Sequence, residues 1–235
     1  MRTYLNAVLL STVALTFALP AVARNPVFAP IEDDPELPRV LLIGDSISIG
    51  YTLPTRTLLE GIANVHRIPM NGGPSSRGVA HIEEWLGDGQ WDVIHFNFGL
   101  HDLKMDKEGN YQVPPEQYRE NLETLVARLE ATGAELVYAT TTPVPQNVGG
   151  PARRTADVIV YNRIAKDIMR EHNIRVNDLY SFAWGQLQSI QKPRNVHFTD
   201  GGSAVLAGQV AYSIRRALGI HAARPTPDAQ VTEEN

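Results

Sequence analysis

The segment VLLIGDS, residues 40–46, runs from apolar side chains into a polar tip that ends in a serine. A serine hydroxyl is a poor nucleophile at neutral pH unless a nearby base takes its proton. Its attack on a carbonyl carbon also needs hydrogen-bond donors aimed at the oxyanion that forms. Ser46 could instead cap the helix that follows, because serine is a favoured capping residue. The choice between these roles depends on what the rest of the chain brings to this point.

A metal site is an alternative use of the histidines in HFNFGLHD, residues 95–102. His101 could bind a metal together with His95 and Asp102, or it could be a structural hydrogen-bonding residue. Alternation along a strand places His95 on the same face as Asn97. No further cluster of histidine and aspartate lies nearby in the sequence. We therefore expect no metal ion and no other cofactor.

Other function classes are excluded by what the sequence lacks. The chain has no cysteine, which rules out disulfides and every cysteine-based enzyme or metal site. The glycine-rich loops that bind nucleotide phosphates are absent, and so is the G-x-S-x-G nucleophile elbow. The formal net charge is −5 and no basic run occurs, so a nucleic-acid partner is not expected.

The elements that must position these residues alternate along the chain. Strands are predicted at residues 39–45, 64–69, 91–99, 134–141 and 173–178. Helices are predicted at residues 52–62, 76–86, 116–132, 156–172 and 200–218. This order implies an α/β fold with a central parallel sheet of about five strands and helices on both faces. Because ligands bind at the carboxyl ends of such strands, Ser46, residues 99–102 and Thr140–Thr142 are expected at one edge.

The ends of the chain differ in composition from the middle. Residues 1–23 have a basic start, an apolar stretch and a small-residue cleavage site, which predicts a secretory signal peptide. An uncleaved membrane anchor is the alternative. The predicted organisation is a signal peptide at 1–23, an N-terminal arm at 24–38, one folded domain at 39–220 and a flexible tail at 221–235. We expect a periplasmic or secreted protein with no stable membrane span after cleavage.

Four short blocks in this order resemble the conserved blocks of the SGNH (GDSL-type) hydrolases. They are IGDSIS at 43–48, NGGPSSRG at 71–78, FGLHD at 98–102 and VHFTDGGSAVLAGQVA at 196–211. The resemblance spans roughly residues 39–218. It implies a flavodoxin-like three-layer sandwich and an esterase that works through an acyl-serine.

The resemblance also implies a role for individual residues. Ser46 would be the nucleophile and His197 the base that takes and returns its proton. The N–H groups of Ser46 and Gly73, with the side chain of His101, would hold the oxyanion. Gly72 is the alternative donor, and both glycines could serve only a turn. Asp45 and Asp102 are expected to support their loops through hydrogen bonds.

Two positions depart from the pattern of that family. His101 stands where the family has asparagine, and a neutral imidazole can still donate one N–H. Arg194 stands three residues before His197, where the family has aspartate. A backbone carbonyl, the side chain of Asn195 or a distant carboxylate must then orient the imidazole. We favour a backbone carbonyl and a Ser-His dyad.

The expected function is removal of small acyl groups, most simply acetyl, from a carbohydrate. The expected partners are therefore small-molecule or polysaccharide esters. Two alternatives stay open at this point. One is an esterase directed at lipids or thioesters, and the other is an SGNH-like carbohydrate-binding module whose altered blocks have lost catalysis.

Overall fold

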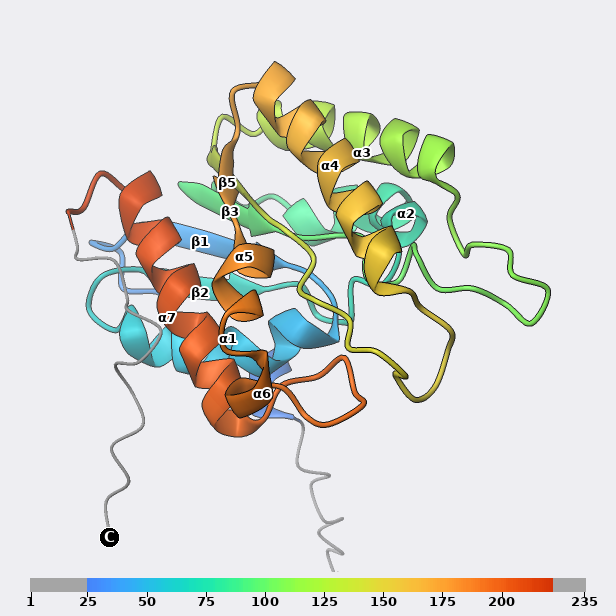
Figure 1. Cartoon of the computed structure of the whole chain (residues 1–235). Coiled ribbons are helices and arrows are strands. Elements are labelled where there is room, and N and C mark those ends of the chain that lie inside the picture. The colour runs from blue at the N-terminus through green and yellow to red at the C-terminus, as the bar shows by residue number, and fades with distance from the viewer. Residues whose placement is uncertain (1–24, 222–235) are drawn as a thin grey trace, which may run out of the picture.

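A parallel sheet of five strands forms the centre of the protein in the computed structural model, which describes residues 25–221 (Figure 1). The strands are β1 (Arg39–Ile43), β2 (Asn64–Arg67), β3 (Val93–Phe96), β4 (Glu135–Ala139) and β5 (Arg175–Asn177). Their order across the sheet is β2-β1-β3-β4-β5, and every neighbouring pair is parallel. The predicted α/β architecture is confirmed. The predicted signal peptide and residues 222–235 of the predicted tail lie outside the described residues.

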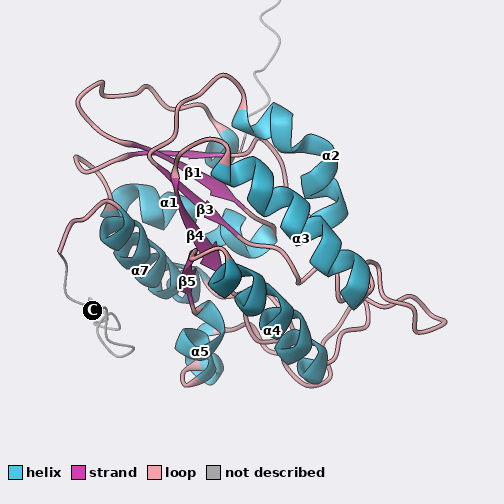
Figure 2. Ribbon diagram, turned by 90° about the horizontal axis from the view of Figure 1, so that it is seen from above, coloured by secondary structure: helices cyan, strands magenta, loops and turns pink. Residues whose placement is uncertain are grey.

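Helices cover both faces of the sheet (Figure 2). They are η1 (Pro26–Phe28), α1 (Ser46–Leu58), α2 (Ser75–Leu86), α3 (Pro115–Glu130), α4 (Thr155–Glu171), α5 (Leu179–Trp184), α6 (Leu187–Ile190) and α7 (Asp200–Ala217). Helices α1 and α7 pack together on one face, and α2, α3 and α4 pack side by side on the other. This is the expected three-layer sandwich. Within residues 25–221, no helix is both long enough and apolar enough to cross a membrane.

The strands are apolar on both sides because both of their faces are covered. Val40, Leu42, Ile94 and Phe96 are completely buried. Parallel strands of this kind are continuous apolar runs rather than alternating ones, as the sequence of β1 and β3 shows. The sheet is therefore a rigid support, and the polar residues that follow each strand are held at its carboxyl edge.

The prediction of a helix over residues 52–62 is wrong at its start. Helix α1 begins at Ser46, directly after β1, because the Asp45 carboxylate caps it by accepting the N–H of Ile47 at 2.9 Å. The segment SISIGY has weak helix propensity, and packing against α7 outweighs it. The short helices α5 and α6 were not predicted either, since neither is long enough to show a helical period.

The predicted N-terminal arm packs on the edge of the sheet over its described residues. Asp33 contacts both Arg39 and His66 at 2.7 Å, and Asp34 exchanges hydrogen bonds with the side chain of Asn64. Val27 in η1 is buried. Helix η1 packs against α1, where Arg56 donates from Nη1 to the Pro26 carbonyl at 3.3 Å.

Candidate active site

Ser46 is the first residue of α1 and follows the carboxyl end of β1. Gly44 makes this tight entry possible, since a Cβ there would lie 2.7 Å from the Cβ of Ser48. Asp45, not Ser46, caps the helix. The Ser46 hydroxyl is therefore free for another role, and its N–H lies in the first turn, where helix N–H groups have no acceptor within the helix. The positive end of the helix dipole is directed at the same point.

His197 lies in a compact loop between α6 and α7. The backbone N–H of Lys192 donates to the His197 carbonyl at 3.0 Å, and the N–H of Thr199 donates to the Ile190 carbonyl at 2.9 Å. Gly202 lets α7 approach α6 closely, because a Cβ there would collide with the Ile190 carbonyl. The last block of the sequence thus fixes where the imidazole stands, although the ring itself is exposed.

The side chains of Ser46, His197 and Asn195 form one hydrogen-bonded chain. His197 Nε2 lies 2.9 Å from Ser46 Oγ, and His197 Nδ1 lies 2.8 Å from Asn195 Oδ1. Asn195 Oδ1 also accepts the backbone N–H of His197 at 3.0 Å. Only the amide oxygen can accept that N–H, so the orientation of the amide is fixed. The proton of the neutral imidazole then lies on Nδ1, and Nε2 presents a lone pair to the serine.

The expectation that a backbone carbonyl orients His197 is wrong. The side-chain oxygen of Asn195, one of the open alternatives, occupies that position. Arg194 adopts a left-handed conformation, with φ of 54°, and its Nε donates to the Asn147 carbonyl at 3.3 Å. This turn brings Asn195 under the imidazole. The sequence could not show it, because an arginine in a left-handed conformation carries no local signal.

The two glycines of the second block differ in how their N–H groups are used. The Gly72 N–H donates to the Gly44 carbonyl at 2.9 Å, which ties this loop to β1. A Cβ at Gly72 would lie 2.9 Å from the same carbonyl oxygen. The Gly73 N–H donates to Asn71 Oδ1 at 2.9 Å in a short side-chain turn, and Gly73 has φ of 63°. Gly73 is the better placed of the two, because its partner is a side chain that an oxyanion can share or replace.

His101 is held by a lysine three residues further on. Lys104 Nζ lies 2.8 Å from His101 Nδ1. An ammonium group has only donors, so Nδ1 must accept and the imidazole proton must lie on Nε2. Burial and the neighbouring charges of Lys104 and Arg153 lower the pKa of His101 to about 3. His101 is therefore a neutral side chain with one N–H to donate.

Asp45 and Asp102 are buried and bound to backbone. Asp102 accepts hydrogen bonds from the N–H and hydroxyl of Ser75 and from the N–H of Gly99, which joins the second and third blocks. Burial raises the pKa of Asp102 to about 6. Burial also raises the pKa of Asp45, while its bond to the Ile47 N–H acts in the opposite direction. Neither carboxylate hydrogen-bonds His197.

The histidines considered as metal ligands lie in different surroundings. His95 is completely buried, and its Nε2 lies 3.1 Å from Asn177 Nδ2. His101 faces Lys104, whose ammonium would repel a metal cation. No group of three or more histidine, aspartate or glutamate residues within residues 25–221 is arranged to hold a metal ion.

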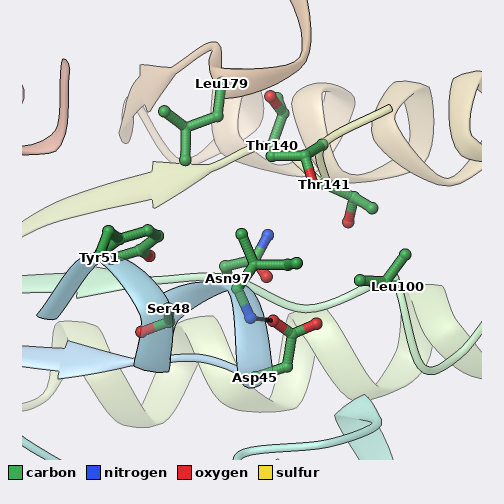
Figure 3. A pocket seen from close by; sticks show the side chains of 10 residues that line it. Asp45, Ser48, Tyr51, Asn97, Leu100, Thr140, Thr141 and Leu179 are labelled. Carbon is green, nitrogen blue, oxygen red and sulfur yellow. Dashed lines mark hydrogen bonds between the residues drawn. The ribbon is translucent and has the colours of Figure 1, made fainter. Parts of the chain in front are cut away.

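A small cavity lies behind the nucleophile (Figure 3). Asp45 and Ser48 line it from the start of α1, Asn97 and Leu100 from the segment after β3, and Thr141 from the segment after β4. The dashed line in Figure 3 marks the bond between Asp45 and the Ile47 N–H. The cavity has room for about one water-sized group. It is too small for a substrate.

A larger groove opens directly beside Ser46 and His197. Its apolar lining includes Ile47, Leu53 and Phe198, and its polar lining includes Lys192 and Asp200. Val27 of η1 contributes one wall, so the arm takes part in shaping the groove. Ser46 and His197 thus lie at the edge of a groove that is large enough for part of a substrate.

Sequence reasoning missed the basic residues around His101. Lys104, Arg77 and Arg153 come from three separate segments, and each is close enough for its charge to lower the pKa of His101. The sequence could have indicated the contact between Lys104 and His101, because side chains three residues apart can meet in a turn. The sequence could not have indicated Arg77 or Arg153, because only the fold brings α2 and the loop before α4 together.

The sequence matches the profile of the GDSL-like lipase/acylhydrolase family over residues 42–205. Similar solved structures include a lipase/acylhydrolase from Enterococcus faecalis, with a TM-score of 0.67, 18% identity, and coverage of 76% of this chain and 96% of that chain. An acetylxylan esterase from Geobacillus stearothermophilus has a TM-score of 0.59, 20% identity, and coverage of 78% and 95%. The acetyl xylan esterase AlAXEase has a TM-score of 0.65, 14% identity, and coverage of 75% and 99%. No curated protein sequence matches the chain.

Proposed function

The chain belongs to the GDSL-like lipase/acylhydrolase family and is a carboxylic ester hydrolase, and we propose that it works through an acyl intermediate on Ser46. The observation that carries this proposal is the chain of hydrogen bonds from Ser46 through His197 to Asn195. A nucleophile, a base and a group that orients the base are the three parts that this chemistry needs.

In the acylation half-reaction, Ser46 Oγ attacks the carbonyl carbon of the ester and its proton passes to His197 Nε2. The bond between the carbonyl carbon and the alcohol oxygen then breaks, and the alcohol leaves with the proton from Nε2. In the second half-reaction, water gives a proton to Nε2 and attacks the acyl group. Ser46 regains its proton from His197, and the acid is released.

The oxyanion of both half-reactions would be held by three groups. The Ser46 N–H and the helix dipole of α1 form one side. The Gly73 N–H forms a second contact when it turns from Asn71 to the substrate. The Nε2–H of His101 replaces the amide of the family's asparagine, and Lys104 keeps the proton on that nitrogen.

The test of this proposal is an inhibitor that reacts with an activated serine. An organophosphonate should add its mass to the peptide that contains Ser46, and Ser46→Ala should abolish both labelling and hydrolysis of 4-nitrophenyl acetate. Ser203→Ala is a matched control, since Ser203 lines the same groove. Labelling of a different serine, or undiminished hydrolysis by Ser46→Ala, would contradict the assignment.

The substrate that we favour is a carbohydrate carrying acetyl groups. Two of the similar solved structures are acetyl xylan esterases. The groove beside His197 would then receive the sugar, because the leaving alcohol must lie next to Nε2. A series of 4-nitrophenyl esters tests this, with kcat/KM expected to fall steeply beyond the acetate.

An apolar acyl group is the second candidate, and the groove gives it a specific basis. Ile49, Leu53 and Phe198 form a continuous apolar part of its lining. If this part binds acyl chains, the octanoate ester will be preferred over the acetate, and Leu53→Ser will lower kcat/KM for octanoate alone. Failure of the wild-type protein to hydrolyse any ester would instead favour the carbohydrate-binding alternative.

Export from the cytoplasm is part of the proposal. Its support is the basic, apolar and small-residue pattern of residues 1–23. Expression of the full chain in a bacterium that secretes proteins, followed by mass spectrometry of the mature N-terminus, tests it. A mature chain that begins at Arg24 in the periplasm or medium is expected.

A further inference from the structure

Three basic side chains converge on the candidate oxyanion site from three different segments. Lys104 Nζ contacts His101 Nδ1 at 2.8 Å. Arg153, from the loop before α4, donates from Nε to the Leu100 carbonyl at 2.9 Å. Arg77, from α2, donates from Nη1 to the Asn71 carbonyl at 3.2 Å, beside Gly73. All three therefore contact the blocks that surround Ser46.

None of these three residues takes part in the ion pairs found within residues 25–221. The arginines elsewhere are often paired, for example Arg128 with Glu83 and Arg170 with Asp167. The nearest carboxylates, Asp45 and Asp102, attract these cations, but both are buried and already bound by backbone N–H groups. Positive charge therefore accumulates here in a chain whose formal net charge is −5.

The reaction itself does not require so much positive charge. One negative charge develops on the oxyanion, and N–H donors suffice to hold it in enzymes of this chemistry. Three like charges close together repel one another, so an arrangement of this kind is stable when an anion lies among them. The terminal nitrogens of Arg153 are not used by its bond to Leu100, and the guanidinium fork suits a carboxylate or sulfate.

We propose that the substrate carries an anionic group next to the ester that is cleaved, and that Arg77 and Arg153 bind it. In chemical terms the substrate is an acylated acidic sugar, whose carboxylate or sulfate group lies beside the acyl-bearing carbon. This inference rests on the proposed esterase function, and it names the class of alcohol that the function leaves open. Lys104 adds to the same positive field while it holds His101.

The test compares substrates that differ only in charge. Per-O-acetylated glucuronic acid and per-O-acetylated glucuronamide have the same ester groups, and acetylated glucose 6-sulfate gives the sulfate form. The expected kcat/KM for the glucuronic acid is at least about 10-fold above that for the amide at low ionic strength, mainly through KM. The ratio should approach one at about 1 M salt, where the Debye length is near 3 Å. A higher rate on the sulfate than on the carboxylate would identify sulfate as the natural anion.

Variants locate the anion site. Arg77→Gln and Arg153→Gln should each lower the acid-to-amide ratio about 3- to 10-fold, since each removes one charge-assisted contact. Arg163→Gln is the matched control, because Arg163 is an exposed arginine of α4 outside the site, and its ratio should equal that of the wild type. Arg153→Lys keeps the charge without the fork and should recover part of the loss.

Two results would overturn the inference in distinguishable ways. If the wild type hydrolyses 4-nitrophenyl acetate through Ser46 but treats the acid and the amide alike, the anion site is wrong and the esterase proposal stands. If no ester is hydrolysed by the wild type, the esterase proposal fails and the inference fails with it.

Discussion

The two sides of Ser46 are built from different kinds of residue. On the base side, His197 is exposed and is oriented by Asn195, a neutral side chain. On the oxyanion side, His101 is partly buried and is oriented by Lys104, a cation, with Arg153 close by. Both sides use an imidazole held by one neighbour. The neighbours impose opposite tautomers, so one ring presents a lone pair to the serine and the other presents an N–H.

This difference shows how charge is distributed in the transition state. Proton transfer from Ser46 creates a positive imidazolium and a negative oxyanion. In a Ser-His-Asp enzyme the aspartate stabilises the positive partner. This chain has a neutral amide on His197 and a cation on His101, so the two sides of the site differ in electrostatic support.

Removal of the base is expected to have the largest effect. His197→Ala should lower kcat by about 10⁴–10⁶-fold, because the serine loses its proton acceptor. His81→Ala is the matched control, since His81 is a half-buried histidine of α2 whose ion-pair partner within residues 25–221 is Glu84. Hydrolysis of 4-nitrophenyl acetate under single-turnover conditions measures both. An alanine variant that keeps wild-type activity would show that the base side has been misassigned.

Removal of the oxyanion-side imidazole is expected to have the next largest effect. His101→Ala should lower kcat by about 10²–10³-fold with little change in KM, the usual effect of losing one oxyanion donor. His101→Asn should recover most of the rate, because the amide also donates an N–H. The acidic limb of the pH profile should be the same in His101→Asn and wild type, since the pKa of about 3 keeps His101 neutral across the working range. An alanine variant as fast as wild type would leave His101 with a structural role.

Loss of Lys104 should have a smaller effect, which depends on His101. Lys104→Met should lower kcat by about 10- to 100-fold, because the ring can then hold its proton on either nitrogen and loses a nearby positive charge. Combined with His101→Asn, the same substitution should cost much less, since an amide has no tautomer to fix. Lys107→Met, an exposed lysine in the same loop, is the control. Equal losses in the two backgrounds would mean that Lys104 does not act through His101.

The sequence predicted the fold well because strands that are buried on both faces are continuous apolar runs in the sequence. Apolar runs such as VLLI and VIHF correspond to β1 and β3, and the order of strands and helices implies the topology. The start of α1 was missed because its signal is a single capping residue, Asp45. Contacts within the site were harder to predict. The sequence suggests Ser46 by its position after a strand, and the resemblance of the last block to the SGNH family suggests His197. The Arg194 turn and the approach of Arg77 exist only in the folded chain.

The smallest expected effect comes from changing the partner of His197, and it tests the comparison most directly. Asn195→Ala should lower kcat/KM about 10-fold, because one neutral hydrogen bond of roughly 1.4 kcal/mol orients the ring. Asn195→Asp keeps the shape and places a carboxylate where Oδ1 lies 2.8 Å from Nδ1. A carboxylate stabilises the imidazolium, so the acidic limb of kcat/KM should move to higher pH by roughly one unit.

At pH values above the acidic limb, Asn195→Asp should be a few-fold faster than wild type if the base side is the less stabilised half of the transition state. Asn173→Asp is the control, because it adds the same charge at an exposed turn after α4. It should change neither the rate nor the position of the acidic limb of the pH profile. An acidic limb that moves without any gain in rate would show that stabilisation of the imidazolium does not limit the reaction. An unmoved limb would show that position 195 does not reach Nδ1 in solution, and the proposed orientation of His197 would have to be abandoned.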